Sequence, residues 1–215
     1  MQPRPTASAP RQQATRHPTR KRLTRAEREQ QILVVAERVF AERGYQGVSM
    51  DDISHLVGLS KPMLYEYFGS KDGLLIACLE RAKRELLEAT SAAAAAATEP
   101  AQLMHNCFAA FFRFGDEHAQ SWALLRNESA IPSVPINSGL EAIRRQQVEF
   151  TSALMQQIRP DIDTERLEVF AEALIGACER LALWREQHPG TSPEETADHL
   201  LALAGTGLFP PERQA

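Results

Sequence analysis

Signals that start and stop helices are crowded between residues 28 and 74, and they allow only short helices there. Apolar residues on a helical period precede Gly44, namely Ile32, Val35, Ala36, Val39 and Phe40. Ser49 can accept a hydrogen bond from the free amides of a new helix, and Gly58 suits the left-handed conformation that ends one. We therefore predict a first helix that ends at Gly44 and a second of about two turns, between Ser49 and Gly58.

A third helix is expected from about Lys61 to Phe68. Ser60 is predicted to cap it, and Pro62 lies in its first turn, where the missing N–H of proline costs no helical hydrogen bond. Gly69-Ser70 repeats the stop and the cap before a long fourth helix. A helix, a short helix, a glycine turn and a second short helix form the geometry that presents one helix to the major groove of DNA.

The third helix carries side chains suited to that task. Lys61, Tyr65 and Tyr67 offer a charge and two hydroxyls to bases or phosphates, whereas Pro62 and Met63 offer apolar contact to thymine methyl groups. Side chains and amides at helix N-termini are expected to bind backbone phosphates. The predicted DNA-binding residues are Ser49, Ser60, Lys61, Pro62, Met63, Tyr65, Tyr67 and Lys71.

Residues 28–75 resemble the DNA-binding domain of the TetR family. The resemblance rests on Ile32-Leu33, Phe40-Ala41-Glu42-Arg43-Gly44-Tyr45, Asp52-Ile53, Val57-Gly58-Leu59-Ser60, Leu64-Tyr65-Glu66-Tyr67-Phe68 and Ser70-Lys71-Asp72-Gly73-Leu74. Three positions depart from the family pattern: Ser49 replaces threonine, Met50 a β-branched residue and Leu56 alanine. Of these, only Leu56 is expected to change how the helices pack. The resemblance implies DNA binding, a regulatory role and a helical second domain.

Charge is divided unevenly along the chain, whose 215 residues have a net charge of −4. Residues 1–85 contain 15 basic and 10 acidic side chains, whereas residues 86–215 contain 9 and 18. Residues 1–25 contain seven basic side chains and no acidic one, and their composition predicts disorder. This segment is either an arm that follows phosphates or enters a minor groove, or a solvated tail.

The remainder of the chain has helical periodicity interrupted by proline-containing breaks. The expected helices cover Leu74 to about Ala97, Gln102 to about His118, Ser121–Ser129, Ser138–Ile158, a segment capped by Asp161–Thr164 that reaches His188, and a last one from Ser192 to about Gly207, with a loop at Ile131–Pro135. The predicted fold class is all-α. A three-helix helix-turn-helix domain (residues 26–73) follows the basic arm (1–25) and precedes a helical effector-binding and dimerisation domain (74–209) and a tail (210–215).

Large apolar residues in the middle helices are candidates for an effector pocket. The candidates are Met104, Phe108, Phe112, Trp122, Phe150, Leu154, Phe170 and Cys178. The alternative is that they form ordinary core. Since TetR-like proteins carry an inducer pocket here, the resemblance favours an apolar or lipid-like effector. A cavity in this domain would support the ligand sensor, and a solid core would support a DNA-binding regulator that senses nothing.

The last two predicted helices mix small residues with leucines, which suits close helix pairing. The resemblance implies that these helices form a four-helix bundle between two subunits, so that a homodimer binds a palindromic operator. The leading interpretation is a repressor that releases DNA when its effector binds. Activation instead of repression stays open.

An enzyme with a helical pocket is the remaining alternative, and the expected motifs are missing. The chain has no H-E-x-x-H, no phosphate-binding glycine loop and no nucleophile elbow, so we predict no catalytic residue, metal or cofactor. Cys78, Cys107 and Cys178 lie far apart and are expected to be buried thiols in a reducing compartment. No apolar run is long enough to span a membrane, so a cytoplasmic protein is expected.

Overall fold

A computed structural model describes residues 23–126 and 138–208, and within these ranges the chain forms helices only. They are α1 (Arg25–Arg43), α2 (Met50–Val57), α3 (Lys61–Phe68), α4 (Lys71–Ala95), α5 (Pro100–Glu117), α6 (Ala119–Arg126), α7 (Ser138–Ile158), α8 (Thr164–Glu186) and α9 (Pro193–Leu208). The predicted all-α class is confirmed. Most of the basic arm, the loop at Ile131–Pro135 and the tail at 210–215 lie outside the described residues.

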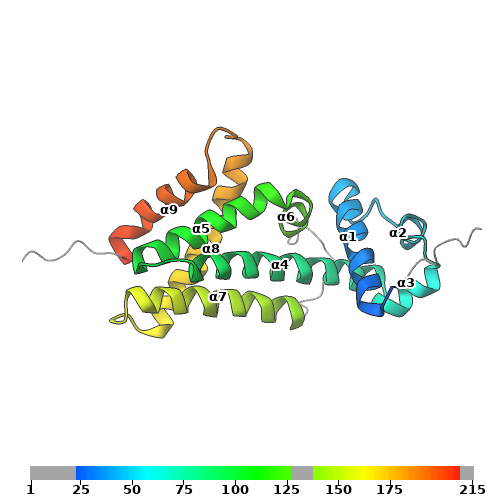
Figure 1. Cartoon of the computed structure of the whole chain (residues 1–215), viewed down its shortest axis with the longest axis horizontal. Coiled ribbons are helices and arrows are strands. Elements are labelled where there is room, and N and C mark those ends of the chain that lie inside the picture. The colour runs from blue at the N-terminus through cyan, green and yellow to red at the C-terminus, as the bar shows by residue number, and fades with distance from the viewer. Residues whose placement is uncertain (1–22, 127–137, 209–215) are drawn as a thin grey trace, which may run out of the picture.

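Helices α1 to α3 form a small domain at one end of the molecule, and α4 runs from it into the larger helical domain (Figure 1). Helices α5 and α7 flank α4, and α9 covers α5 (Figure 1). The predicted boundary between residues 73 and 74 falls in the first turn of α4. Because α4 contributes to the cores of both domains, a change in its position alters the packing of both.

Local capping explains where the first helices begin and end. At α2, the Asp52 amide donates to Ser49 Oγ and the Ser49 amide donates to Asp52, which is the predicted cap with a reciprocal partner. Gly58 has φ 66° and ψ 37°, the left-handed conformation that costs glycine little. Helix α1 starts at Arg25, because Thr24 and Glu27 form a capping box that the sequence interpretation missed.

The predicted side-chain cap of α3 is wrong in one respect. Ser60 occupies the N-cap position, but its hydroxyl makes no capping hydrogen bond. Pro62 removes one of the two amides that a cap could bind, and the amide of the next residue, Met63, donates to the Ser60 carbonyl at 3.0 Å. Proline in the first turn therefore stabilises the helix start without the serine side chain.

Helices α1, α2 and α3 and the first turns of α4 form the core of the small domain. Fully buried side chains from each of these helices meet there, among them Ile32, Ile53, Leu64, Leu74 and Leu75. The helical domain has its own core, in which α5 contributes most of the aromatic rings. The Phe111 and Trp122 rings meet edge to face with centroids 5.5 Å apart, so α6 is packed tightly against α5.

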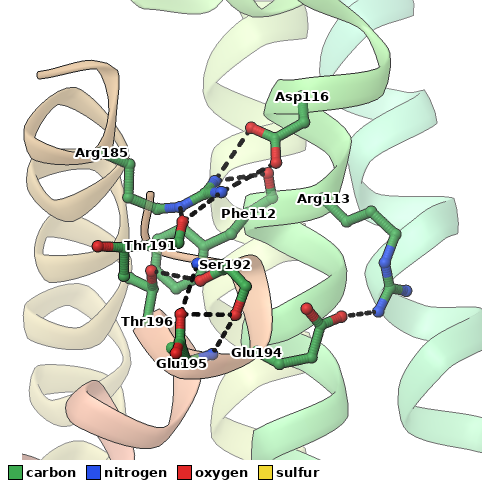
Figure 2. A network of polar contacts seen from close by, with 9 residues as sticks. All are labelled: Phe112, Arg113, Asp116, Arg185, Thr191, Ser192, Glu194, Glu195 and Thr196. Atoms are coloured by element: carbon green, nitrogen blue, oxygen red, sulfur yellow. Dashed lines mark hydrogen bonds and ion pairs between the residues drawn. The ribbon is translucent and has the colours of Figure 1, made fainter. Parts of the chain in front are cut away.

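Arg185 near the end of α8 ties three segments together. Figure 2 shows its guanidinium between the Asp116 carboxylate on α5 and the Thr191 carbonyl in the turn before α9. It donates to Asp116 at 2.9 and 3.1 Å and also to the Phe112 carbonyl. Glu195 and Ser192 form the predicted cap of α9 beside it. None of the described helices is both long and apolar enough to cross a membrane.

Candidate nucleic-acid interface

One side of α3 is exposed and forms what we call the reading face: Lys61, Pro62, Met63 and Tyr65. Leu64, which lies among them in the sequence, is fully buried and holds α3 against the small core. Tyr67 is half-buried and packs on that core, with the Arg25 guanidinium 5.0 Å from its ring centroid. Tyr67 therefore offers less surface to a partner than Tyr65.

The reading-face lysine is held by an acidic residue of α2. Lys61 Nζ lies 2.8 Å from Asp51 Oδ2, and both side chains are exposed. The hydrogen bond to Asp51 raises the pKa of Lys61, so its positive charge is kept at any physiological pH. We expect Asp51 to compete with a phosphate or base for this lysine, a role that the sequence interpretation did not include.

Asp51→Asn is expected to strengthen binding to all DNA sequences about threefold to tenfold at low salt. It frees Lys61 and removes a negative charge beside the phosphates, and the gain should shrink as salt is added. Titrations at two salt concentrations would measure this. Asp198→Asn on α9 is the matched control, since it makes the same charge change far from α3. Unchanged affinity in Asp51→Asn would contradict the competition.

The side chains predicted to bind phosphates at the helix N-termini differ in how far contacts within the chain already engage them. The Ser49 hydroxyl accepts from the Asp52 amide and also lies 2.5 Å from the Asp52 carboxylate, so its hydrogen-bonding capacity is largely used by the cap. Lys71 Nζ sits 4.0 Å from the Tyr45 ring centroid, and the Tyr45 hydroxyl donates to Asp72. Lys71 is thus ordered at the N-terminus of α4 and is the better candidate for a phosphate.

Two further residues bear on this surface. The Arg25 guanidinium lies over the ring of Tyr67 on α3 and adds a positive charge there. The capping box at Thr24 was the sequence signal that could have placed Arg25 on α1. Leu56 is 48% exposed on α2, so the expectation that it changes the packing angle is wrong. Its side chain points outward instead of lying between helices.

The helical domain contains hollows of about 580, 490 and 360 Å³ that are open to solvent, and the one of about 360 Å³ is what we call the main cavity. Its apolar lining comes from Leu86, Phe111, Trp122, Leu125, Ile175 and Leu183, and its polar lining from Lys83, Arg126, Arg144, Gln147 and Glu179. A further hollow of about 30 Å³ shares Phe111, Gln147 and Ile175 with it. The main cavity and this hollow therefore adjoin each other.

The predicted effector residues are only partly gathered at these hollows. Trp122 lines the main cavity, and Phe108, Phe150 and Cys178 line the small one. Phe112 and Trp122 line the hollow of about 490 Å³, which shares Trp122 and Arg126 with the main cavity. Met104, Leu154 and Phe170 line none of these hollows; the first two are buried core, and Phe170 is half-buried beside Arg166.

Charged residues of the main cavity were not predicted. Arg126 pairs with Glu186, and Arg144 Nη2 lies 3.3 Å from Glu172 Oε2, a hydrogen bond that raises the pKa of Arg144. These arginines sit near the ends of helices that meet only in the folded chain, which is why spacing gave no signal for them.

The cysteines are free and buried as predicted. Burial raises the pKa of the Cys107 thiol to about 12, so it remains protonated and unreactive. Among the described residues, no group of histidine, cysteine and acidic side chains is arranged to hold a metal ion.

A small helix-turn-helix domain joined by one long helix to a second helical domain is the architecture of a class of DNA-binding transcriptional regulators. Residues 32–78 match the family model described as bacterial regulatory proteins, tetR family, and residues 100–207 match a tetracyclin repressor-like C-terminal domain. This chain therefore belongs to the TetR family and is a DNA-binding transcriptional regulator.

Individual relatives agree with this assignment. The transcriptional activator FasR of Mycolicibacterium smegmatis is 38% identical over 104 residues, which is 48% of this chain and 48% of FasR, so the match spans about half of that protein. A TetR-like regulator from Rhodococcus sp. RHA1 is 33% identical, with a TM-score of 0.66 over 88% of this chain and 100% of that one. AibR, solved with isovaleryl coenzyme A and operator DNA, shares the fold at 21% identity, with a TM-score of 0.65 over 86% of this chain and all of AibR. These relatives are regulators and not enzymes.

Proposed function

We propose that this protein is a homodimeric repressor that acts in the cytoplasm, binds a palindromic operator through the reading face of each subunit, and releases it when an effector enters the main cavity. The observation that carries the proposal is the 360 Å³ cavity, because Trp122, Leu125 and Arg126 of its lining belong to α6, the helix that packs on α1. An effector that favours a different position of α6 shifts the population of DNA-binding conformations.

The proposed dimer uses an apolar stripe on α8 and α9. Val169, Ala173, Gly176 and Trp184 fall on one side of α8 and are exposed, and Leu203 on α9 is 77% exposed. Leu174 of α8 and Leu200 of α9 are not part of this stripe, because they are buried in the subunit's own core. Exposed apolar surface of this kind is typical of an interface between subunits.

The double variant Trp184→Glu, Leu203→Glu is expected to be a folded monomer that loses at least about tenfold in operator affinity, because only one reading face then binds at a time. Sedimentation and a gel shift would measure both effects. Val34→Glu is the control, since Val34 is another exposed apolar residue but lies on α1. A wild-type chain that sediments as a monomer at micromolar concentration would contradict the proposed dimer.

The chemistry of the main cavity favours an effector with an apolar body and an anionic group. Lys83, Arg126 and Arg144 reach it from α4, α6 and α7, against one acidic residue, Glu179, although residues 86–215 as a whole are strongly acidic. Each guanidinium has five donors, so its ion pair leaves donors for a second anion. The acyl thioester bound in the AibR structure is a molecule of this kind.

A panel of matched compounds tests this effector class: short and medium acyl-coenzyme A thioesters, the free acids, and uncharged esters with the same chains. Anionic members are expected to raise the melting temperature by several degrees and to release a bound operator. Leu183→Trp, which fills part of the cavity, should keep DNA binding and lose the response. If no compound shifts the melting temperature, the sensor role fails and a regulator without an effector remains.

Activation is the second candidate, and the similarity to FasR, named as an activator, favours it. A promoter reporter in cells with and without the chain distinguishes the two. Expression that rises when the chain is deleted supports repression, and expression that falls supports activation.

A further inference from the structure

A carboxylate is buried where the two domains meet. Glu37 of α1 has a side chain only 5% exposed, and it faces α4 and α6. Its Oε1 lies 3.3 Å from Arg81 Nη1 on α4, and its Oε2 accepts a hydrogen bond from the Ser121 hydroxyl on α6 at 3.4 Å. We call these three residues the joint. They connect the DNA-binding head to the two helices through which the helical domain reaches it.

The joint satisfies the ionised carboxylate poorly. Arg81 is shared, because its Nε binds Glu85 at 2.8 Å, a shorter distance than the one to Glu37. Glu37 Oε1 and Arg81 Nη1 are buried and make no hydrogen bond with any described residue, so their contact is electrostatic only. A buried charge with few hydrogen bonds is costly, and taking up a proton relieves that cost.

The charges around Glu37 determine the direction of this effect. Burial raises the pKa of Glu37 to about 7, Glu85 raises it further, and Arg81 and Ser121 oppose the change. The other titratable neighbour on α4 is the Cys78 thiol, whose pKa is raised by burial and by Glu37, so it stays neutral. Helix α6 contributes the uncharged Ser121.

Proton binding at Glu37 is therefore linked to docking of the head. When α1 is packed on α4 and α6, Glu37 binds a proton up to about pH 7, whereas in a hydrated position it would lose that proton near its ordinary value. Raising the pH through neutrality favours the loosened joint. Helix α6 lies next to α1 at the end of α5 (Figure 1), and its residues after Ser121 line the main cavity.

We propose that Glu37 is a positioning residue for DNA binding, which holds the head against α4 and α6 in its protonated form and loosens the joint when it ionises. The joint acts on DNA binding, which family membership establishes, and requires neither the proposed effector nor the proposed dimer. The chain would thereby read cytoplasmic pH near neutrality in addition to any ligand.

Operator affinity against pH tests the proposal in the full-length chain without effector. The probe is a duplex selected by the chain from a random DNA pool, and titrations run from about pH 6 to about pH 8 at constant ionic strength. The operator affinity of the wild-type chain is expected to change up to about tenfold over this range. A single carboxyl group whose pKa is about 7 in the docked joint and ordinary in the loosened joint shifts the docking equilibrium by that factor. In Glu37→Gln this component should be absent.

Glu42→Gln is the matched control, because Glu42 is an exposed carboxylate on the same helix. It should keep the wild-type profile. An operator affinity that rises with pH and one that falls with pH both support the proposal, provided that the change depends on Glu37. The direction of the change shows whether DNA binds better to the docked or to the loosened joint. Profiles of wild type and Glu37→Gln that coincide would overturn it.

A second measurement does not depend on DNA or on how the variant folds. Carbon-13 NMR of the glutamate carboxyl groups in the wild-type chain, with the Glu37 signal assigned by its loss in Glu37→Gln, follows the proton directly. A midpoint near neutral pH, with amide shifts in α1 and α6 that follow the same curve, supports the proposal. A midpoint near 4.5 would overturn it.

Discussion

Leu64→Ala is expected to destabilise the DNA-binding domain by about 3 kcal/mol and to abolish sequence-selective DNA binding. Leu64 is the one residue of α3 that is fully buried, and its neighbours on the core side, Tyr67 and Phe68, are only half-buried. Removing the side chain leaves a cavity under a two-turn helix that has little propensity to persist alone. Denaturant unfolding and a gel shift would measure the two losses.

Met63→Ala is the matched control for Leu64→Ala. Met63 is the preceding residue, lies on the reading face and is exposed, so its loss should leave stability within about 0.5 kcal/mol and change only affinity or base preference. The pair separates the anchoring of α3 from its contacts. Equal stability of the two variants would mean that the reading helix is held by something other than its buried leucine.

Arg185→Met should cost roughly 3 kcal/mol, which corresponds to a fall of about 6–12 °C in the melting temperature of a chain this long. The Arg185 side chain is 10% exposed, and its guanidinium binds the Asp116 carboxylate and the carbonyls of Phe112 and Thr191. Methionine keeps the apolar stem and removes every one of these bonds. Because the turn that presents α9 is fastened here, the proposed dimer should weaken as well.

Arg113→Met provides the comparison within the same network (Figure 2). Arg113 pairs with Glu194, but both side chains are about half exposed, so water and salt screen the interaction. The expected loss is below about 1 kcal/mol. Thermal melting of the two variants measures this difference. Similar falls in melting temperature for Arg113→Met and Arg185→Met would show that burial of the guanidinium adds nothing to stability.

Helix ends were predicted well because capping is a local interaction. The caps at Ser49 and Ser192 join residues three positions apart, and the helix ends at Gly44 and Gly58 each depend on a single glycine with a positive φ. The errors were also local. The capping box at Thr24 was overlooked, and Pro62 removed the need for a side-chain cap from Ser60.

The site was predicted unevenly for a physical reason. Helical periodicity predicted that Leu64 packs inward, whereas Tyr67, predicted among the DNA-binding residues, is half-buried against the core. Cavity walls do not follow from periodicity, since apolar side chains that form core and those that border a cavity look alike in a sequence. Met104 and Leu154 became core, whereas Leu86 and Leu183 came to line the main cavity.

The sequence by itself determined the helical class, the order and ends of the helices, the buried side of α3 and membership of a DNA-binding family, because each depends on residues within a few positions of one another. Only the tertiary structure decided that α4 serves both cores, that basic side chains from three helices line one cavity, and that Glu37 meets Ser121 across 84 positions of sequence. Those features depend on how whole helices pack, and the free energy of that packing is spread over many weak contacts with no local signature.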